Sequence, residues 1–392
     1  MNYIIFDNFR RSYLLPLTFT RPVADIRIGI LTIREKWEHF LGAKTSSLTE
    51  DYLSAKFPIV KGEDNILING SILPNDKIAA EIMKLENNHA LVQDEVIIAI
   101  RVTEDDLDSP DDAEGMEELE TDCEFLKLNA TWDIFHKNDE ALRADYDIIT
   151  KGRKSEPLSK TNTLLGDDIF IEKGAKIECV TINTTTGPVY IGKDTEIMEG
   201  TVIRGPFAIC NNSVVKMSAK IYGATTIGPY SKVGGELNNV VIFGYSNKAH
   251  DGYLGNSVIG EWCNLGADTN NSNLKNNYEI VKMWSYPDQT FVDTGHQFCG
   301  LVMGDHSKCG ISTMFNTGTV IGVNSNIFGS GFQRNFIPSF AWGGTKGFDN
   351  FSIRKAIDIA KRVYSRRDIE FDEKEQGIMR AIKELTAMNT SY

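Results

Sequence analysis

One histidine, His250, stands in a sequence context that could carry out proton-transfer chemistry. It lies in the segment Lys-Ala-His-Asp-Gly-Tyr-Leu-Gly, residues 248–255. An imidazole titrates near neutral pH, so it can take the proton of an amine that attacks a thioester carbonyl. The same reaction needs a hydrogen-bond donor for the oxyanion that forms on that carbonyl. A lone histidine is more often a surface or packing residue, so the surrounding chain must decide between the two interpretations.

Three arginines near the start of the chain point to a different chemistry. Arg10, Arg11 and Arg21 flank the segment Leu-Pro-Leu-Thr-Phe-Thr, residues 15–20. A planar guanidinium binds phosphate oxygens in pairs, so these side chains could grip a nucleoside triphosphate. The alternative is that they form ordinary surface ion pairs.

Aliphatic residues recur every six positions in the part of the chain around His250, and this repeat indicates which element positions the histidine. The longest run is Ile191, Ile197, Ile203, Ile209, Val215, Ile221, Ile227 and Val233; shorter runs are Leu165, Ile171, Ile177; Ile259, Leu265; and Met303, Cys309, Phe315, Ile321, Ile327. This period resembles the hexapeptide repeat of the left-handed parallel β-helix, in which three short strands form one triangular coil and the aliphatic side chains point inward. A β-sandwich has period-two strands, and a fixed period of six over eight units disfavours it.

The phase of this repeat changes three times along the chain. We expect corner insertions within residues 178–190, 234–258 and 266–302. An insertion at a corner leaves the inward column intact and projects from the coil, so a site is expected there. His250 falls in the second of these segments.

The two ends of the chain lack the six-residue period. Residues 1–160 alternate short apolar runs with helix-like stretches, which is typical of an α/β (Rossmann-like) domain. Residues 161–345 are expected to form the β-helix and residues 346–392 short C-terminal helices. Asp372, followed three residues later by Glu375, predicts the start of the last helix.

Composition excludes several classes of protein. The chain has 392 residues and a net charge of −13, which disfavours a nucleic-acid-coating protein. Twelve acids and no base lie in residues 103–124, which we expect to be a solvated loop or a partly disordered insert. No apolar run is long enough to span a membrane, and the first residues do not read as a secretory signal. The six cysteines form no Cys-x-x-Cys motif and are expected to be free thiols in the cytoplasm.

In the β-helix half, residues 246–256 and the Asn-Leu-Gly-Ala-Asp-Thr segment at 264–269 resemble the acetyltransferase part of the bifunctional sugar-1-phosphate nucleotidyltransferase/N-acetyltransferases. The resemblance implies that His250 is the general base. It implies that Tyr253, Asn264, Asn273 and Lys248 contact the substrate. The Ala267 backbone amide would face the thioester of acetyl-CoA.

In the N-terminal half, residues 15–22 resemble the Arg-Pro-Leu-Thr stretch of the same family. The positions of the family's glycine-rich phosphate loop read Asn-Phe-Arg-Arg-Ser-Tyr here, without glycine. Arg10, Arg11 and Arg21 could substitute for that loop in part, by binding the phosphates of a triphosphate through their side chains. The resemblance places Asn69 at the strand end where the family has a magnesium-binding aspartate; no metal ligand is assigned.

The main hypothesis is a sugar-1-phosphate nucleotidyltransferase coupled to acetyl-CoA-dependent N-acetyl transfer on an amino-sugar phosphate, as in the synthesis of nucleotide sugars like UDP-N-acetylglucosamine. The resemblance implies Mg²⁺ and acetyl-CoA as cofactors, a sugar 1-phosphate and UTP or dTTP as substrates, and a homotrimer. Two alternatives stay open. One is a nucleotidyltransferase alone, like glucose-1-phosphate thymidylyltransferase, and the other is a non-catalytic trimeric scaffold that binds sugar nucleotides.

Overall fold

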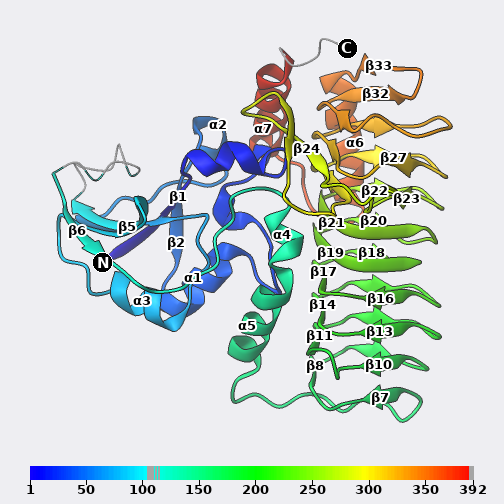
Figure 1. Ribbon diagram of the computed structural model, residues 1–392, viewed down its shortest axis with the longest axis horizontal. Helices are drawn as coiled ribbons and strands as arrows, with labels where there is room; N and C mark the ends of the chain where they lie inside the picture. Colours follow the sequence, from blue (N-terminus) through cyan, green and yellow to red (C-terminus); the bar gives the residue numbers. More distant parts are fainter. Residues whose placement is uncertain (104–109, 111–112, 114, 388–392) are drawn as a thin grey trace. The chain divides into compact units, whose positions relative to one another are not determined.

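A computed structural model describes residues 1–103, 110, 113 and 115–387 of the chain (Figure 1). It divides into two compact units. The first unit comprises Met1–Leu14, Thr20–Ile26 and Leu31–Ala130, and the second comprises Leu15–Phe19, Arg27–Ile30 and Thr131–Tyr392.

The first unit is built on a mixed six-stranded sheet of order β2-β1-β3-β5-β4-β6. Strands β2, β1 and β3 are parallel, and β5 runs antiparallel to both β3 and β4. The strands are β1 (Asn2–Phe6), β2 (Thr45–Leu48), β3 (Asp64–Asn69), β4 (His89–Gln93), β5 (Val96–Thr103) and β6 (Glu117–Glu120). The helices are α1 (Ile33–Leu41), α2 (Asp51–Ser54) and α3 (Asp76–Ile82), with 3-10 helices η1 (Phe9–Leu14) and η3 (Val23–Asp25). The predicted α/β pattern is confirmed.

The acidic segment 103–124 lies only partly within the described residues, because residues 104–109, 111–112 and 114 are outside them. In the described part, the expected loop is wrong for Glu117–Glu120. These residues form strand β6, which pairs in parallel with β4. The backbone hydrogen bonds offered by β4 thus outweigh the low strand propensity of glutamate.

The second unit is a left-handed parallel β-helix with three faces, whose coils stack in sequence order (Figure 1). The first face contains β7 (Thr163–Leu165), β10 (Thr181–Asn183), β13 (Val202–Arg204), β16 (Lys220–Tyr222), the first halves of β19 (Glu236–Gly244) and β21 (Tyr253–Glu261), and the pair β23 (Asn270–Asn271) and β28 (Met314–Phe315). The second face contains β8 (Ile169–Ile171), β11 (Val189–Ile191), β14 (Phe207–Ile209), β17 (Thr225–Ile227), the second halves of β19 and β21, β26 (Leu301–Met303), β29 (Thr319–Ile321) and β31 (Phe336–Ile337). The third face contains β9 (Lys176–Ile177), β12 (Glu196–Ile197), β15 (Val214–Val215), β18 (Lys232–Val233), β20 (Asn247–Lys248), β22 (Asn264–Leu265), β27 (Lys308–Cys309), β30 (Asn326–Ile327), β32 (Ala341–Gly344) and β33 (Gly347–Asn350). The predicted fold class is confirmed.

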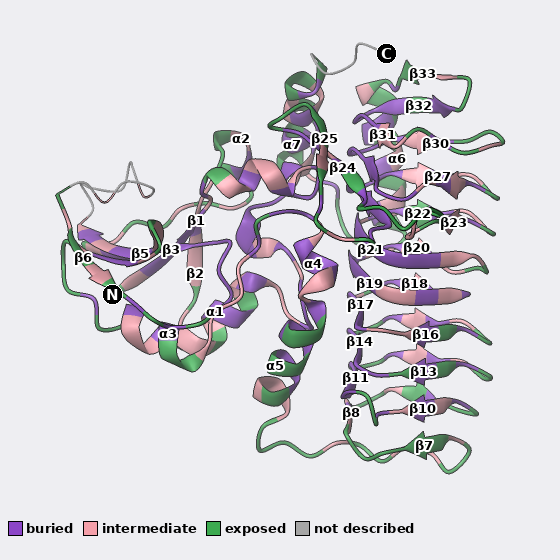
Figure 2. Ribbon diagram, in the orientation of Figure 1, coloured by how far each residue is buried: buried purple, intermediate pink, exposed green. Residues whose placement is uncertain are grey.

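The six-residue repeat does form the core of the solenoid. All eight residues of the run from Ile191 to Val233 are buried in one continuous apolar cluster. Figure 2 shows buried residues recurring along the strands of the solenoid. Stacking each side chain on its equivalent one coil away removes a column of apolar surface from water, which stabilises the coil. Leu165 is an exception to the pattern, since it lies on the first coil and remains exposed.

The expected insertion within residues 234–258 is wrong. The inward positions there are Leu237, Ile242, Lys248 and Leu254, which are spaced by five or six residues. Strands β19 and β21 each run from the first face to the second without a loop. Val233 and Leu237 are also only four residues apart. The phase therefore changes because three corners are shortened, and His250 lies at an ordinary corner of the coil.

The largest insertion is confirmed within residues 266–302. It leaves the coil after β23 and returns at β26, and it carries the antiparallel hairpin of β24 (Lys282–Ser285) and β25 (Thr290–Asp293). The hairpin opens a corner between the first and second faces and leaves the column intact.

Helices cover two parts of the solenoid. Helices α4 (Asp133–His136) and α5 (Asn138–Thr150) pack on the second face, where the Asn138 amide donates to the Ala224 carbonyl at 2.8 Å. The 3-10 helix η2 (Leu17–Phe19) also belongs to this unit.

The chain ends in α6 (Ile353–Ser365) and α7 (Glu373–Leu385). As predicted, Asp372 caps α7 by accepting from the Glu375 N–H at 2.9 Å. Among the described residues, no helix combines the length and the apolar character needed to cross a bilayer.

Candidate functional site

A cavity of about 720 Å³ lies in the second unit, beside corners of the third face and the end of α6. It brings together three of the residues singled out from the sequence, namely His250, Asn264 and Ala267. Its other lining residues are Lys232, Tyr245, Asn247, Ala249, Trp262, Cys263, Leu265, Gly266, Lys308, Ile311, Val363, Arg366 and Arg367.

His250 and Ala267 occupy equivalent corners on two consecutive coils. The His250 side chain is exposed to the cavity solvent. The corners are tied together by the Asp268 N–H, which donates to the Asp251 carbonyl at 2.9 Å. In the described part of the chain, the Ala267 N–H has no hydrogen-bond acceptor. This pair thus offers one proton acceptor and one unused backbone donor to the same space.

Four cationic side chains line the same cavity: Lys232, Lys308, Arg366 and Arg367. Burial lowers the pKa of Lys232, and the positive charges of Arg367, Lys216 and Arg366 lower it further. Burial lowers the pKa of Lys308 to about 8. Like charges gathered without neutralisation favour an anionic ligand. Sequence analysis missed all four, because the two lysines come from two different coils and the two arginines directly follow α6.

A column of stacked rings holds α6 against the solenoid. Tyr245 lies on Trp262 with ring centroids 4.2 Å apart, and Tyr364 of α6 lies on Trp262 at 3.9 Å. Tyr230, Tyr245, Trp262 and His306 all adopt left-handed backbone conformations at one corner of successive coils. Each follows an inward residue of the second face by three positions. This regular spacing of aromatic residues is visible in the sequence, but the six-residue period alone did not point to it.

Tyr253 and Asn273 lie together but outside the lining of this cavity. The Asn273 side-chain amide donates to the Tyr253 hydroxyl at 2.9 Å and to the side-chain Oδ1 of Asn256 at 2.7 Å. The structure therefore pairs these two predicted substrate contacts with each other, and separates them from His250 within one chain.

Lys248 points into the solenoid and is also absent from the cavity lining. Its side chain is 2% exposed, and its ammonium donates to the carbonyls of Gly234 at 3.1 Å and His250 at 2.6 Å. A direct contact between this ammonium and a substrate in the cavity has no support in this arrangement.

In the first unit, two of the four predicted nucleotide contacts already have partners inside the fold. The Arg11 guanidinium lies 3.2 Å from Asp7 and 3.3 Å from Glu50, and it donates to the Tyr52 hydroxyl at 2.8 Å. Asn69 ends β3 as predicted, but its amide accepts from Ser71 and donates to the Ile97 carbonyl at 2.9 Å.

The other two predicted nucleotide contacts differ in exposure. The Arg10 guanidinium lies over the rings of Phe9 and Tyr13, at 4.6 and 5.6 Å from their centroids. Arg21 is buried, with 6% of its surface exposed. Arg10 is therefore the better placed of the two to meet a ligand from solvent.

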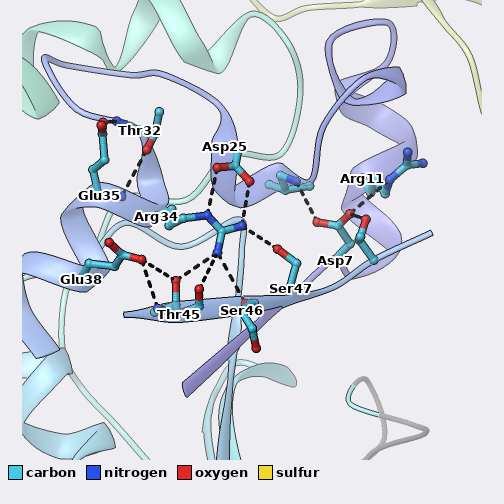
Figure 3. Close-up of polar contacts among 12 residues, drawn as sticks. Asp7, Arg11, Asp25, Thr32, Arg34, Glu35, Glu38, Thr45, Ser46 and Ser47 are labelled. Atoms are coloured by element: carbon cyan, nitrogen blue, oxygen red, sulfur yellow. Dashed lines mark hydrogen bonds and ion pairs between the residues drawn. The ribbon is translucent and has the colours of Figure 1, made fainter. Parts of the chain in front are cut away.

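Asp7 is a titratable group at this sheet edge that sequence analysis missed. It directly follows β1 and accepts hydrogen bonds from the Val23 N–H at 2.8 Å and the Thr49 hydroxyl at 2.5 Å (Figure 3). Nearby, Arg34 of α1 makes a two-bond contact with Asp25, at 2.9 and 2.7 Å, and a bond to Ser47 of β2. Ligands of α/β folds bind at the carboxyl ends of parallel strands, which is the edge that Asp7 occupies.

The titration of Asp7 gives a testable pH dependence of stability. Burial raises the pKa of Asp7 to about 6, above about 3.9 in an unfolded chain. The folded state therefore binds the Asp7 proton more tightly than the unfolded state does. As a result, the contribution of Asp7 to the free energy of unfolding falls as pH rises from about 4 to 6. We expect the free energy of unfolding of Asp7→Asn to exceed that of the parent by about 1–3 kcal/mol at pH 7.5. Near pH 4 the two free energies should differ little. Urea unfolding across this pH range measures it; a parent more stable than the variant at pH 7.5 would contradict it.

A metal site for Mg²⁺ is not apparent at this edge. Among the described residues, no group of three or more histidine, cysteine, aspartate or glutamate side chains is arranged to hold a metal ion. Asn69, the predicted counterpart of the metal-binding position, has both amide atoms engaged. Asn69 therefore does not offer a free ligand atom for Mg²⁺ at this position.

Comparison with known proteins found one matching family model and several relatives of part of the chain. Residues 3–154 match the family described as sugar nucleotidyl transferase. The bifunctional protein GlmU of Methanococcus aeolicus is 29% identical over 208 residues, which cover 53% of this chain and 45% of that protein. The chain is thus similar to sugar nucleotidyl transferases over residues 3–154 and to a bifunctional GlmU protein over about half of its length. The resemblance inferred from the sequence is thereby confirmed.

Two further relatives match smaller parts of the chain. A bifunctional sugar-1-phosphate nucleotidylyltransferase/acetyltransferase of Sulfurisphaera tokodaii is 28% identical over 144 residues, covering 36% of this chain and 35% of that protein. The putative uncharacterized acetyltransferase YaiX of Escherichia coli is 29% identical over 159 residues, covering 40% of this chain and 68% of that protein. The chain therefore spans less than half the length of the bifunctional relatives it matches. Their names support a transferase.

Proposed function

We propose that the second unit catalyses acetyl-CoA-dependent N-acetylation of an amino-sugar phosphate in the cavity between the third face and α6. The observation that carries the proposal is that His250 and the unused Ala267 N–H line one cavity together with four cations. Acyl transfer needs just these elements, namely a base for the amine proton, a donor for the oxyanion and cations for the phosphates of the donor.

The roles of the residues follow from their chemistry. Acetyl-CoA, when bound, supplies the activated acetyl thioester. The His250 imidazole would accept the proton that the substrate amine loses, and the Ala267 N–H would donate to the oxygen of the attacked carbonyl. Lys232, Lys308, Arg366 and Arg367 would bind phosphate groups, and Asn264 at the rim would hydrogen-bond the sugar.

The first unit is proposed to transfer a nucleotide from UTP or dTTP to a sugar 1-phosphate, making a nucleotide sugar of the UDP-N-acetylglucosamine kind. The match of residues 3–154 to the sugar nucleotidyl transferase family supports this. Arg10 is the proposed phosphate contact, because Arg11 and Asn69 are engaged inside the fold. No role for Mg²⁺ is derived from these residues.

Two assays test the proposed function. Acetyl-CoA with glucosamine 1-phosphate should release thiol, and UTP or dTTP with sugar 1-phosphates should release pyrophosphate. Thiol release without pyrophosphate would limit the function to acetyl transfer, and pyrophosphate alone would favour the thymidylyltransferase-like alternative. Neither product would favour the scaffold alternative.

The four cationic side chains that line the cavity lead to a prediction for CoA binding. Arg366 is exposed at the cavity, so Arg366→Glu should weaken CoA binding about tenfold or more, and added salt should reduce the difference. Isothermal titration calorimetry with CoA is the measurement. Arg354→Glu makes the same charge change at an exposed position of α6 outside the cavity and is the matched control. Equal losses in both variants would show that only long-range charge matters.

We also propose a homotrimer. In one chain, Tyr253 and Asn273 lie away from the His250 cavity, and a neighbouring chain would allow both groups of residues to serve one shared site. Light scattering should give about three times the 43.8 kDa of one chain. A stable monomer that still transfers acetyl groups would contradict a shared site.

A further inference from the structure

The third face of the solenoid contains one inward residue that does not fit its column. Its neighbours along the face are aliphatic residues or cysteine, and Val233 stands in register with Lys248. The column on this face reads Ile177, Ile197, Val215, Val233, Lys248, Leu265, Cys309 and Ile327. Burying an ammonium costs free energy that an aliphatic side chain of similar size would not. Core packing alone therefore does not account for a lysine at this position.

The ammonium of Lys248 spans two successive corners of the solenoid. It donates to the Gly234 carbonyl at 3.1 Å and to the His250 carbonyl at 2.6 Å. The shorter bond fixes the main chain of the residue whose imidazole lines the cavity. Asn247, Ala249 and His250 line the cavity while Lys248 does not, as expected where a strand alternates its side chains between its two sides.

We propose that Lys248 is a positioning residue, which holds the backbone of His250 from inside the solenoid so that the imidazole faces the cavity. This proposal rests on the function proposed for His250. It assigns Lys248 a different role from the substrate contact that the family resemblance implied. Burial lowers the pKa of Lys248 to about 8, while the negative charges of Asp251 and Asp268 oppose this. The side chain is thus mostly an ammonium at neutral pH, and a charged donor makes the stronger hydrogen bond.

Lys248→Met tests the proposal, because methionine fills the space of the lysine stem and cannot donate. We expect the variant to fold with an unchanged or higher melting temperature. Its kcat for acetyl transfer should fall by about 10- to 100-fold, the scale of a small misplacement of a reacting group. The KM for glucosamine 1-phosphate and the Kd for CoA should stay within about twofold of the parent.

Val215→Ala is the matched control, since Val215 is an inward residue two coils earlier on the same face. It should lower the melting temperature and leave kcat unchanged. A raised KM with unchanged kcat in Lys248→Met would mean that the ammonium contacts substrate and would overturn the proposal. An unchanged kcat would overturn it too, as would a kcat loss that Val215→Ala reproduces.

A second readout does not depend on activity. The imidazole resonances of His250, assigned by their loss in His250→Ala, should shift or broaden in Lys248→Met, while those of His39 should not. If the parent releases no thiol, the proposed function fails, and unchanged His250 resonances would then separately overturn the positioning role. If Lys248→Met does not fold, Lys248→Gln is measured in the same way, with a smaller loss expected because its amide can still donate to one carbonyl. No change of its kcat or of the His250 resonances would overturn the proposal.

Discussion

Replacing His250 by alanine is expected to lower the turnover of acetyl transfer by roughly 10²–10⁴-fold, the usual contribution of a positioned general base. The affinity for CoA should change little, because the imidazole acts on the amine and not on the donor. Steady-state thiol release is the measurement.

The control for this prediction is His39→Ala, since His39 is exposed on α1 of the first unit. His306 is a poorer control, because its ring is buried near Trp262 and Tyr364. If His250→Ala kept the parent turnover, His250 would not be the general base. The proposal that His250 and Ala267 act together in acyl transfer would then be wrong.

The second large effect is expected at Tyr364. This side chain is buried, and its ring stacks on Trp262 at 3.9 Å. Removing a buried aromatic ring costs about 3–5 kcal/mol. We expect Tyr364→Ala to loosen α6, expose its amides to hydrogen exchange and weaken CoA binding at least tenfold, because Arg366 and Arg367 leave the cavity with the helix end.

Tyr364→Phe keeps the ring and is the matched control. It should preserve most of the protection of α6 and most of the CoA affinity. Full CoA affinity in Tyr364→Ala, together with increased exchange in α6, would show that the helix end plays no part in binding.

The solenoid could be predicted from the sequence because its period is enforced by packing. The eight aliphatic residues spaced by six from Ile191 to Val233 must all point inward to be buried, so their spacing is visible without a structure. The same reasoning failed between Val233 and Ile259. Leu237 and Ile242 are spaced by five, since β19 crosses a corner without a loop. A changed phase alone cannot distinguish a lengthened corner from several shortened ones.

The candidate site could be predicted only in part, for a related reason. His250, Asn264 and Ala267 are close in sequence and lie on neighbouring coils, so one motif carries them all. Arg366 and Arg367 reach the cavity from the end of α6, where Tyr364 packs on Trp262, about a hundred residues earlier in the chain. Lys248 looked like a surface contact, because the period of six had been lost at that point and its inward direction was not visible.

In the first unit, residue identity proved a poor guide to exposure. Arg11 and Arg21 are charged, yet both are buried, and Arg11 bonds to Asp7, Glu50 and Tyr52. Asn69 lies at the predicted strand end, but Ser71 and Ile97 occupy its amide. Glu50, Tyr52 and Ile97 are distant in sequence from these side chains, so only the fold reveals which polar groups remain available to a ligand.

The central claim is that acyl transfer takes place in the cavity between the third face and α6. A crystal structure of the protein with CoA bound tests it most directly. We predict that the CoA thiol lies beside the Ala267 N–H and the His250 imidazole, with its phosphates among Lys232, Lys308, Arg366 and Arg367. CoA bound at another place on the solenoid, with this cavity empty, would contradict the account.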